Sequence, residues 1–366
     1  MLLKPGTKIC FVTAGLGFGG AERVISTLSN FLADNGVKVT ILTVSNFFEE
    51  PAFELRSSIK VCRLKYGRVP ILRNIQHIKK IRKAIIEINS DIVISFLSTI
   101  NIYTLISLIG SKVPIIVSER NDPKMDPKVV WKRILRNLIY PLSSGYVFQT
   151  EEAKNYFSKE IREKGVVIPN PLMIRNMPRV WEKERRKEIV AVGRLEDQKN
   201  YPLLLKAFSK LSHQFSDYKL IIYGDGSKKE QLEMLCENLN ISNKVLFAGI
   251  HKDVLNRING AKLYVLSSNY EGMPNALMEA MAVGLPCIST DCPCGGPRYL
   301  IEHETNGLLV ELNNVDQLTR AIETLLSNNN KSIKISKEAI KIRENLSIEQ
   351  VTSMWEKYII EILGDM

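Results

Sequence analysis

The sequence predicts an α/β protein built from two doubly wound, Rossmann-like domains that face a cleft. Three observations favour this fold class. At 366 residues, the chain exceeds what one hydrophobic core usually organises. Apolar strand patterns alternate with helical patterns along the chain, which is typical of parallel sheets covered on both faces. This alternation occurs twice, once in each half of the sequence.

The apolar runs give ten expected strands. In the first half they cover residues 8–15, 38–44, 91–97, 113–119 and 145–150. In the second half they cover 188–195, 218–226, 243–250, 262–268 and 285–291. Because such sheets bind ligands beyond the carboxyl ends of their strands, the cleft between the domains is the expected site.

The boundary between the two domains is expected in residues 166–188, where three prolines and a dense charge cluster interrupt the periodicity. We therefore expect an N-terminal domain over 1–168 and a C-terminal domain over 188–344. The last segment, 345–366, has an amphipathic helical pattern with Val351, Met354, Trp355 and Tyr358 on one stripe. No strand follows it, so we expect this helix to pack back on the N-terminal domain.

The net charge of the chain favours some classes of binding partner over others. Fifty Lys and Arg residues against 39 Asp and Glu give a net charge of +11, which favours acidic partners such as nucleotide phosphates or anionic lipid headgroups. Nucleic acid is not expected, since no binding module is recognisable. No apolar run approaches the roughly 18 residues of a membrane span. We expect a cytoplasmic protein, at most peripheral on the inner face of the cytoplasmic membrane.

The six cysteines are scattered, which is typical of reduced thiols in a reducing compartment. The only close pair, Cys292 and Cys294, has one intervening residue and no second half-site. A zinc site normally needs two to four intervening residues. We therefore expect no zinc here.

A glycine-rich turn follows the first expected strand. In "FVTAGLGFGGAERV", Gly15, Gly17 and Gly20 have the GxGxxG spacing between a strand and a helix, which suits a phosphate-bearing ligand. However, the second strand ends in Ser45 and Asn46, with no carboxylate to hold the ribose of NAD. A turn that is merely tight remains an alternative.

Polar residues follow another buried strand in "VSERNDPK". Glu119 and Arg120 come directly after the strand, at the carboxyl end of the first sheet, and Asn121 and Asp122 follow them. This run is too polar for a core position. Its residues are expected either in an exposed loop or in a site.

Two basic amphipathic stretches cover residues 71–85 and 129–142. The second combines Trp131 and neighbouring aliphatic residues with Lys132, Arg133 and Arg136, which is typical of a helix on an anionic bilayer. The alternative is a helix whose apolar face packs on the core and whose basic face is solvated.

The second half contains two cations and two carboxylates with a recognisable spacing. Arg194 and Lys199 follow the strand in "EIVAVGRLEDQKN", where they suit a diphosphate leaving group. In "NYEGMPNALMEAMAVGLPCIST", Glu271 lies before a short helix that Pro274 begins, and Glu279 lies within it. The alternative is that one glutamate stabilises the helix start and the other is solvated.

Together these motifs resemble a known family. "GRLEDQKN", "IYGDG", "FAGI", "NYEGMPNALMEAMAVGLPCIST" and "NGLLV", in this order, are similar to the donor half of retaining GT-B glycosyltransferases of family 4. The pair Glu271 and Glu279 matches the E-x7-E motif of that family. "GGAERV" and "SERND" look most like bacterial enzymes that extend lipid-linked O-antigen or related glycans. The resemblance covers nearly the whole chain.

The resemblance implies a role for each matching residue. Arg194 and Lys199 would hold the donor diphosphate, Glu279 would bind the ribose hydroxyls, and Glu271 would lie by the transferred sugar. The backbone of further residues would line the sugar and the diphosphate of the donor: Gly19, Gly20, Gly272, Met273, Pro274 and Asn275. Many members carry a histidine that contacts the donor sugar where this chain has Arg120, so no family role is copied onto Arg120. Glu119 and Arg120 are nevertheless the expected substrate contacts of this run.

The expected activity is retaining transfer of a hexose or N-acetylhexosamine from a UDP-sugar to a polyprenyl-diphosphate-linked glycan of a bacterial surface polysaccharide. No acidic metal motif accompanies the site, and we expect neither cofactor nor catalytic metal, since the two cations can neutralise the leaving group. Two alternatives remain: an NAD-dependent oxidoreductase or epimerase, and a catalytically silent GT-B protein that serves as a binding scaffold.

Overall fold

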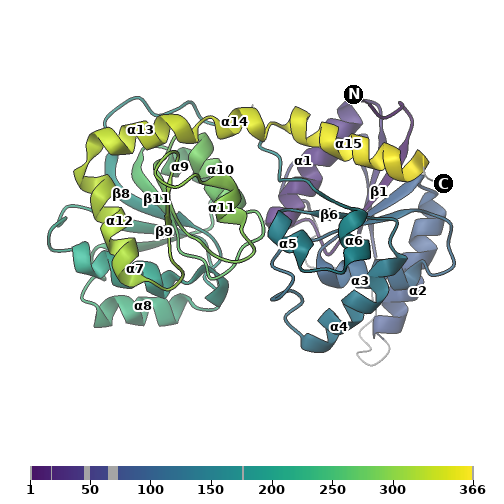
Figure 1. The fold of residues 1–366 in the computed structure, drawn as a ribbon, viewed down its shortest axis with the longest axis horizontal. Coiled ribbons are helices and arrows are strands. Elements are labelled where there is room, and N and C mark those ends of the chain that lie inside the picture. Colours follow the sequence, from purple (N-terminus) through teal and green to yellow (C-terminus); the bar gives the residue numbers. More distant parts are fainter. Residues whose placement is uncertain (1, 18, 45–49, 65–72, 175–176, 365–366) are drawn as a thin grey trace. The chain divides into compact units, whose positions relative to one another are not determined.

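The computed structural model of the chain describes residues 2–17, 19–44, 50–64, 73–174 and 177–364 (Figure 1). It forms two compact units. Unit 1 comprises Met1–Pro171 and Leu346–Met366, and unit 2 comprises Leu172–Asn345. The division between Pro171 and Leu172 lies inside the interval 166–188. Ser45, Asn46 and residues 71–72 of the first basic stretch lie outside the described residues.

Unit 1 is built on a parallel sheet of seven strands in the order β3-β2-β1-β4-β5-β6-β7. The strands are β1 (Lys8–Thr13), β2 (Lys38–Thr43), β3 (Lys60–Arg63), β4 (Ile92–Phe96), β5 (Ile115–Ser118), β6 (Gly145–Phe148) and β7 (Gly165–Val167). The helices are α1 (Gly20–Asp34), α2 (Arg73–Ile88), α3 (Ser98–Ser107), α4 (Val130–Ile139), η1 (Tyr140–Leu142), α5 (Glu151–Asn155), α6 (Lys159–Glu163) and α15 (Ile348–Gly364). β4 and β5 are buried along their whole length, as expected for central parallel strands.

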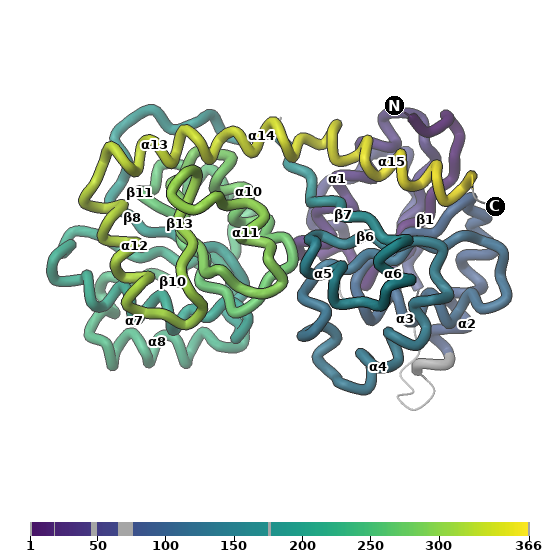
Figure 2. Tube along the Cα trace, viewed as in Figure 1, coloured from purple at the N-terminus to yellow at the C-terminus, as the bar shows by residue number. Residues whose placement is uncertain are grey.

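The last helix of the chain completes the core of unit 1. In Figure 2, α15 runs beside α1 and β1, at the other end of the sequence. Val351, Trp355 and Ile359 are buried in the same apolar cluster as the strands. The Trp355 ring stacks on Phe96 at 5.9 Å between centroids. The predicted stripe is wrong at Met354, which is exposed on the outer side of the helix.

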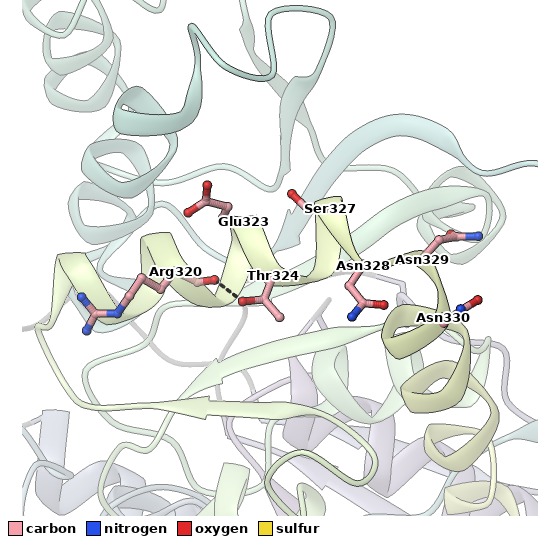
Figure 3. A pocket seen from close by; sticks show the side chains of 7 residues that line it. All are labelled: Arg320, Glu323, Thr324, Ser327, Asn328, Asn329 and Asn330. Carbon is pink, nitrogen blue, oxygen red and sulfur yellow. Dashed lines mark hydrogen bonds between the residues drawn. The ribbon is translucent and has the colours of Figure 1, made fainter.

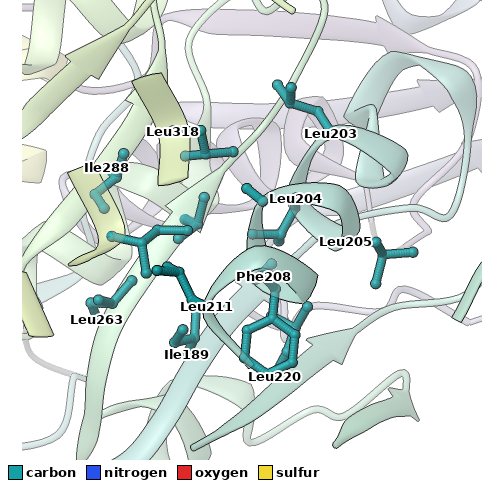
Figure 4. Packing of buried hydrophobic residues seen from close by; sticks show 14 of the residues in the cluster. Ile189, Leu203, Leu204, Leu205, Phe208, Leu211, Leu220, Leu263, Ile288 and Leu318 are labelled. Atoms are coloured by element: carbon teal, nitrogen blue, oxygen red, sulfur yellow. The ribbon is translucent and has the colours of Figure 1, made fainter. Parts of the chain in front are cut away.

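Unit 2 repeats the plan with six parallel strands in the order β10-β9-β8-β11-β12-β13. The strands are β8 (Arg186–Val192), β9 (Lys219–Tyr223), β10 (Val245–Gly249), β11 (Ala261–Leu266), β12 (Cys287–Thr290) and β13 (Leu308–Val310). The helices are η3 (Asp197–Lys199), α7 (Tyr201–Leu211), α8 (Lys229–Asn238), α9 (Val254–Ile258), α10 (Asn275–Ala282), α11 (Gly296–Leu300), α12 (Val315–Ser327), α13 (Asn329–Ala339) and α14 (Ile342–Asn345). Figure 4 shows leucines and isoleucines from α7, α12 and the strands packed together in its core.

The ten predicted strands are all present, and three further strands were missed. β3, β7 and β13 have three or four residues each and lie at sheet edges. A short edge strand needs little apolar sequence, because it is paired on one side only and need not be buried on both faces. In both sheets the strand order reverses beside the first strand, so the doubly wound fold class is confirmed. None of the described helices is long and apolar enough to cross a membrane.

Candidate active site

An ion pair lies at the point in unit 2 where the strand order reverses. β8 and β11 are neighbours there, and the loops that follow them carry Lys199 and Glu271. Lys199 Nζ donates to Glu271 Oε1 at 2.5 Å, and the two side chains are only 14% and 8% exposed. Ser268 Oγ donates to the same oxygen at 2.7 Å. The carboxylate is therefore fixed by a cation and a hydroxyl from opposite loops.

The two loops are tied to each other by further hydrogen bonds. Asn269 N donates to Gln198 O at 2.8 Å, and Gln198 Nε2 donates to Tyr270 O at 3.1 Å. Ser267 Oγ donates to Lys199 O at 2.8 Å. Sequence reasoning missed these residues, although their signal is visible as polar residues directly after two buried strands. They hold the Lys199 backbone in place and so preorganise the ion pair.

Glycines allow the close approach of chain segments at this edge of the sheet. A Cβ atom on Gly296 would lie 1.6 Å from the carbonyl oxygen of Gly272, so the start of α11 and the loop after β11 could not meet with any other residue. A Cβ on Gly193 would lie 2.8 Å from Cε of Lys199. Both glycines therefore leave room for the close packing of chain segments around the Lys199–Glu271 pair.

Arg194 differs from Lys199 in its surroundings. It follows β8 by two residues and is exposed, and its Nη2 donates to Gln198 Oε1 at 3.2 Å. An exposed guanidinium anchored by one neutral bond keeps most of its donors available for a planar anion such as a phosphate group. The two predicted cations thus lie on one loop, one partly buried and one open to solvent.

The second glutamate of the motif lies on a helix that is buried nearly all round. α10 begins at Asn275, one residue after the predicted first position, Pro274. Glu279 is buried with its helix neighbours 277–282, so the alternative of a solvated Glu279 is wrong. Gly272, Met273 and Pro274 are buried and Asn275 is half-buried. Glu279 is thus a buried carboxylate within a short helix.

The charge of Glu271 affects the groups around it. Burial, and secondarily the negative charge of Glu271, raise the pKa of the Tyr201 hydroxyl, which donates to Gly193 O at 3.0 Å. The same two causes raise the pKa of the Cys292 thiol. These neighbours therefore stay neutral, and Lys199 is the residue that balances the carboxylate.

The glycine-rich turn of unit 1 leads into the start of α1. Gly15 and Gly17 are buried, whereas Gly19 and Gly20 are exposed. Gly19 is the N-cap of the 15-residue α1, without a side chain to bond the first amides. The carboxylate of Glu22, in the first turn of α1, lies against Gly19, where an added Cβ atom would be 2.1 Å from its Oε2, so a negative charge already stands at this helix start.

The "SERND" run is more buried than predicted. Glu119 is enclosed in the core of unit 1, where Tyr140 Oη donates to its Oε1 and Ser98 Oγ lies 3.0 Å from its Oε2. Burial raises the pKa of Glu119. Asp122 is also buried. The expectation that these residues are too polar for the core is wrong, because hydroxyl partners satisfy the Glu119 carboxyl there.

Arg120 packs against aromatic rings. Its guanidinium lies 4.3 Å from the centroid of Phe96 and 5.5 Å from that of Trp355, and Nη1 donates to Asn170 Oδ1 at 2.9 Å. Burial lowers the pKa of Arg120 to about 9. The side chain thus joins the loop after β5 to β4 and α15 by cation–π contacts, and to Asn170 by a hydrogen bond.

Helix α4 exposes apolar side chains, as a helix on a bilayer would, but it buries one of its predicted surface cations. Arg136 is fully buried: its Nη1 donates to Asp126 O at 2.6 Å and its Nη2 to Pro123 O at 3.0 Å. Its guanidinium also lies over Tyr156 and Phe157. Apolar side chains of α4 face solvent instead. Counting Arg136 among the surface cations was therefore wrong.

A polar hollow of about 700 Å³ lies elsewhere in unit 2 (Figure 3). Its lining comes from α12, Asn328 and the start of α13. Thr324 Oγ1 is bonded to Arg320 O at 2.7 Å within the lining. No strand end or glycine turn contributes to it, so we assign no substrate to this hollow.

Comparison with known proteins identifies the family of the chain. Residues 18–173 match the family described as "Glycosyltransferase Family 4", and residues 174–342 match "Glycosyl transferases group 1". A relative from Campylobacter jejuni is 31% identical over 366 residues, covering 97% of this chain and 99% of its own. This relative is the GalNAc-α-(1->4)-GalNAc-α-(1->3)-diNAcBac-PP-undecaprenol α-1,4-N-acetyl-D-galactosaminyltransferase.

Solved structures share the fold at lower identity. Sucrose-phosphate synthase from Thermosynechococcus elongatus superposes with a TM-score of 0.85 at 16% identity, covering 98% of this chain and 100% of its own. HepE of Anabaena, in complex with UDP-glucose, gives a TM-score of 0.79 at 18% identity, with 98% and 100% of the two chains covered.

Proposed function

The chain belongs to the family 4 glycosyltransferases, with the GT-B fold, and we propose that it transfers a hexose or N-acetylhexosamine from a UDP-sugar, with retention, to a polyprenyl-diphosphate-linked glycan. The product would be part of a bacterial surface polysaccharide such as O-antigen or capsule. Family membership argues against the NAD-dependent alternative. The observation that carries the proposal is the Lys199–Glu271 pair beside the exposed Arg194.

In this proposal the loops after β8 and β11 bind different parts of the UDP-sugar. Arg194 and Lys199 bind the diphosphate and neutralise the charge that develops on UDP as the glycosidic bond breaks. The Lys199 ammonium has three donors, so it can bridge Glu271 and a phosphate oxygen. Glu271 lies by the transferred sugar, and Glu279 accepts hydrogen bonds from the ribose hydroxyls.

Unit 1 would supply the acceptor side. Gly19 and Gly20 at the start of α1 face the donor diphosphate, and Glu119 and Arg120 act through the shape of the acceptor domain rather than by direct contact. Support for a lipid-linked acceptor comes from the Campylobacter relative, whose substrate name includes PP-undecaprenol. An acceptor of that kind places the reaction on the inner face of the cytoplasmic membrane. The roles require no metal, since two cations serve the leaving group.

The experiment that tests the proposal combines a panel of UDP-sugars with two isosteric variants. The protein should hydrolyse or transfer from one of the UDP-sugars and be thermally protected by it, because a bound ligand raises apparent stability. Glu279→Gln should weaken UDP and UDP-sugar alike by about 1–3 kcal/mol, the scale of one charge-assisted bond. Glu271→Gln should leave UDP affinity nearly intact but lower the transfer rate.

Calorimetric titration with UDP, beside a transfer assay, separates these effects. Glu237→Gln, which changes an exposed carboxylate on α8, is the matched control and should behave like the parent protein. If both site variants bound UDP and transferred sugar normally, the donor assignment would be abandoned. Binding of UDP without any transfer would favour the catalytically silent scaffold instead.

A further inference from the structure

One face of α4 exposes a row of large apolar side chains. Trp131, Ile134, Leu138 and Leu142, at the end of η1, are between 56% and 71% exposed. Their spacing of three or four residues puts them on a single helical stripe. Soluble proteins rarely leave such a contiguous apolar row in water, so the stripe calls for a partner.

The rest of unit 1 prevents α4 from turning this stripe inward. Arg136 lies on the opposite side of the helix and is held in the core by the carbonyl oxygens of Pro123 and Asp126. Tyr140, at the start of η1, is also buried. Rotating the helix would leave a buried guanidinium without its acceptors, which is costly. The stripe is therefore a fixed surface feature of the folded unit.

The charges around the stripe are of one sign. Lys124 and Lys128 are exposed before the helix, and Lys132 Nζ lies 5.7 Å from the Trp131 ring. Between residues 124 and 142 the sole carboxylate is Asp126, which accepts from Ser98 Oγ at 2.6 Å. An apolar row framed by lysines complements an anionic interface with an apolar interior.

The stripe continues into a small pocket. Leu142 is shared with a cavity of about 200 Å³ at the corner between α3 and β5. Leu105, Leu108 and Ile109 line it, and Lys112 stands among the lining residues. A small pocket that combines these aliphatic side chains with a cationic one suits the end of a flexible hydrocarbon chain better than a second folded surface.

We propose that α4 and the adjoining pocket form the membrane-docking surface of this protein, with the stripe inserted into the interface of an anionic phospholipid bilayer and one acyl chain end in the pocket. The purpose of the surface rests on the proposed function, in which the acceptor is lipid-linked. Docking would bring unit 1 to the bilayer by a surface separate from the donor residues of unit 2.

Trp131 provides a direct reporter for the test. With vesicles of phosphatidylglycerol and phosphatidylcholine, its fluorescence should shift to the blue and be quenched by lipids brominated on the acyl chain. Trp131→Phe should abolish this shift, since Trp355 is already buried and Trp181 is bonded within unit 2. An unchanged spectrum in the parent protein would overturn the proposal.

The double variant Ile134→Ser, Leu138→Ser should weaken vesicle binding by about tenfold or more, because two apolar side chains lose their burial. Met234→Ser, Leu246→Ser is the matched control in unit 2, where both side chains are 55% exposed, and should bind normally. Lys112→Glu should weaken binding to anionic vesicles, with a smaller effect at high salt. Equal binding by the stripe variant and the control would refute the surface.

Two further measurements are needed. One tests whether a second copy of this chain covers the stripe, and the other separates membrane docking from the proposed transferase activity. Sedimentation should find the same oligomeric state for parent and stripe variant; loss of a dimer in the variant would mean that a second copy covers the stripe. Vesicle binding needs no sugar donor, so it can succeed where transfer fails. Conversely, the stripe variant should keep transfer to a short, water-soluble acceptor while losing vesicle binding.

Discussion

Both units place a glutamate after a buried strand, but the two side chains have different surroundings. Glu119 follows β5 directly and stays in the core, where its partners are the hydroxyls of Tyr140 and Ser98. Glu271 comes five residues after β11, in a loop that brings it to the ammonium of Lys199. The acid next to the strand is thus held by neutral groups, and the acid further along is held by a cation.

This difference shows how the surroundings of a carboxyl group decide whether it stabilises the fold or takes part in ligand binding. A carboxyl group held by hydroxyls in the core can be neutral and contributes packing and hydrogen bonds. A carboxylate paired with an ammonium, on the same loop as an exposed arginine, lies near a place that a ligand can reach. Variants in each unit should therefore fail in different ways: those of unit 1 in stability, and those of unit 2 in activity.

The largest expected effect is on the stability of unit 1. Trp355→Ala removes the ring that stacks on Phe96 and covers Arg120, and should cost about 3–5 kcal/mol of unfolding free energy. Met354→Ala, its exposed neighbour on α15, is the control and should cost little. Urea unfolding of both variants measures the difference. UDP affinity, which we assign to unit 2, should be unchanged in the folded Trp355 variant.

The next effect is on turnover. Arg194→Ala and Lys199→Ala should each lower the rate about a hundredfold or more, as expected for losing a charge that stabilises the leaving group. Lys199→Ala should also cost about 1–3 kcal/mol of stability, because it leaves a buried carboxylate without its cation. Arg194→Ala should not, since that side chain is exposed. Steady-state rates and thermal unfolding test the two parts; near-normal turnover in both variants would refute the diphosphate role.

The sequence was most informative where long apolar runs and turn residues coincide. All ten predicted strands and the doubly wound order follow from that signal, while β3, β7 and β13 were missed because a three- or four-residue edge strand leaves almost no pattern. The order of elements could be predicted because helices must cover both faces of each sheet. The burial of α10 all round could not, since it depends on which later segments pack over it.

For the candidate site, the sequence singled out Arg194, Lys199, Glu271 and Glu279, but it did not show which residues hold the loops of Lys199 and Glu271 together. The ties from Gln198, Asn269 and Ser268 depend on two loops meeting in space. Arg136 shows the same limit: on a helical pattern it reads as a surface cation, yet backbone carbonyls in the core accept its hydrogen bonds. Partners from distant segments decide whether a charge is exposed, and a local pattern does not contain them.

The smallest expected effect concerns the pH dependence of unit 1, and it tests whether Glu119 is held as a neutral acid. Three oxygen–oxygen contacts join Tyr140, Glu119, Ser98 and Asp126, but the two hydroxyls supply only two protons, so a third proton is needed. Burial raises the pKa of Glu119 and makes this carboxyl the natural holder of that proton. The folded state then binds more protons than the unfolded state at pH values above the ordinary glutamate pKa of about 4.3. The unfolding free energy should consequently be highest below that value and fall as the pH rises through the folded pKa.

Glu119→Gln keeps the shape of the side chain and a hydrogen-bond donor but does not titrate, so it should flatten this fall. Glu163→Gln, which changes an exposed carboxylate on α6, serves as the control. Urea unfolding at a series of pH values, followed by the fluorescence of Trp355, measures the slope. A parent protein whose stability rises over the same range would show that Glu119 is ionised, and the contrast with Glu271 would then lie only in the partners, hydroxyls for Glu119 and an ammonium for Glu271.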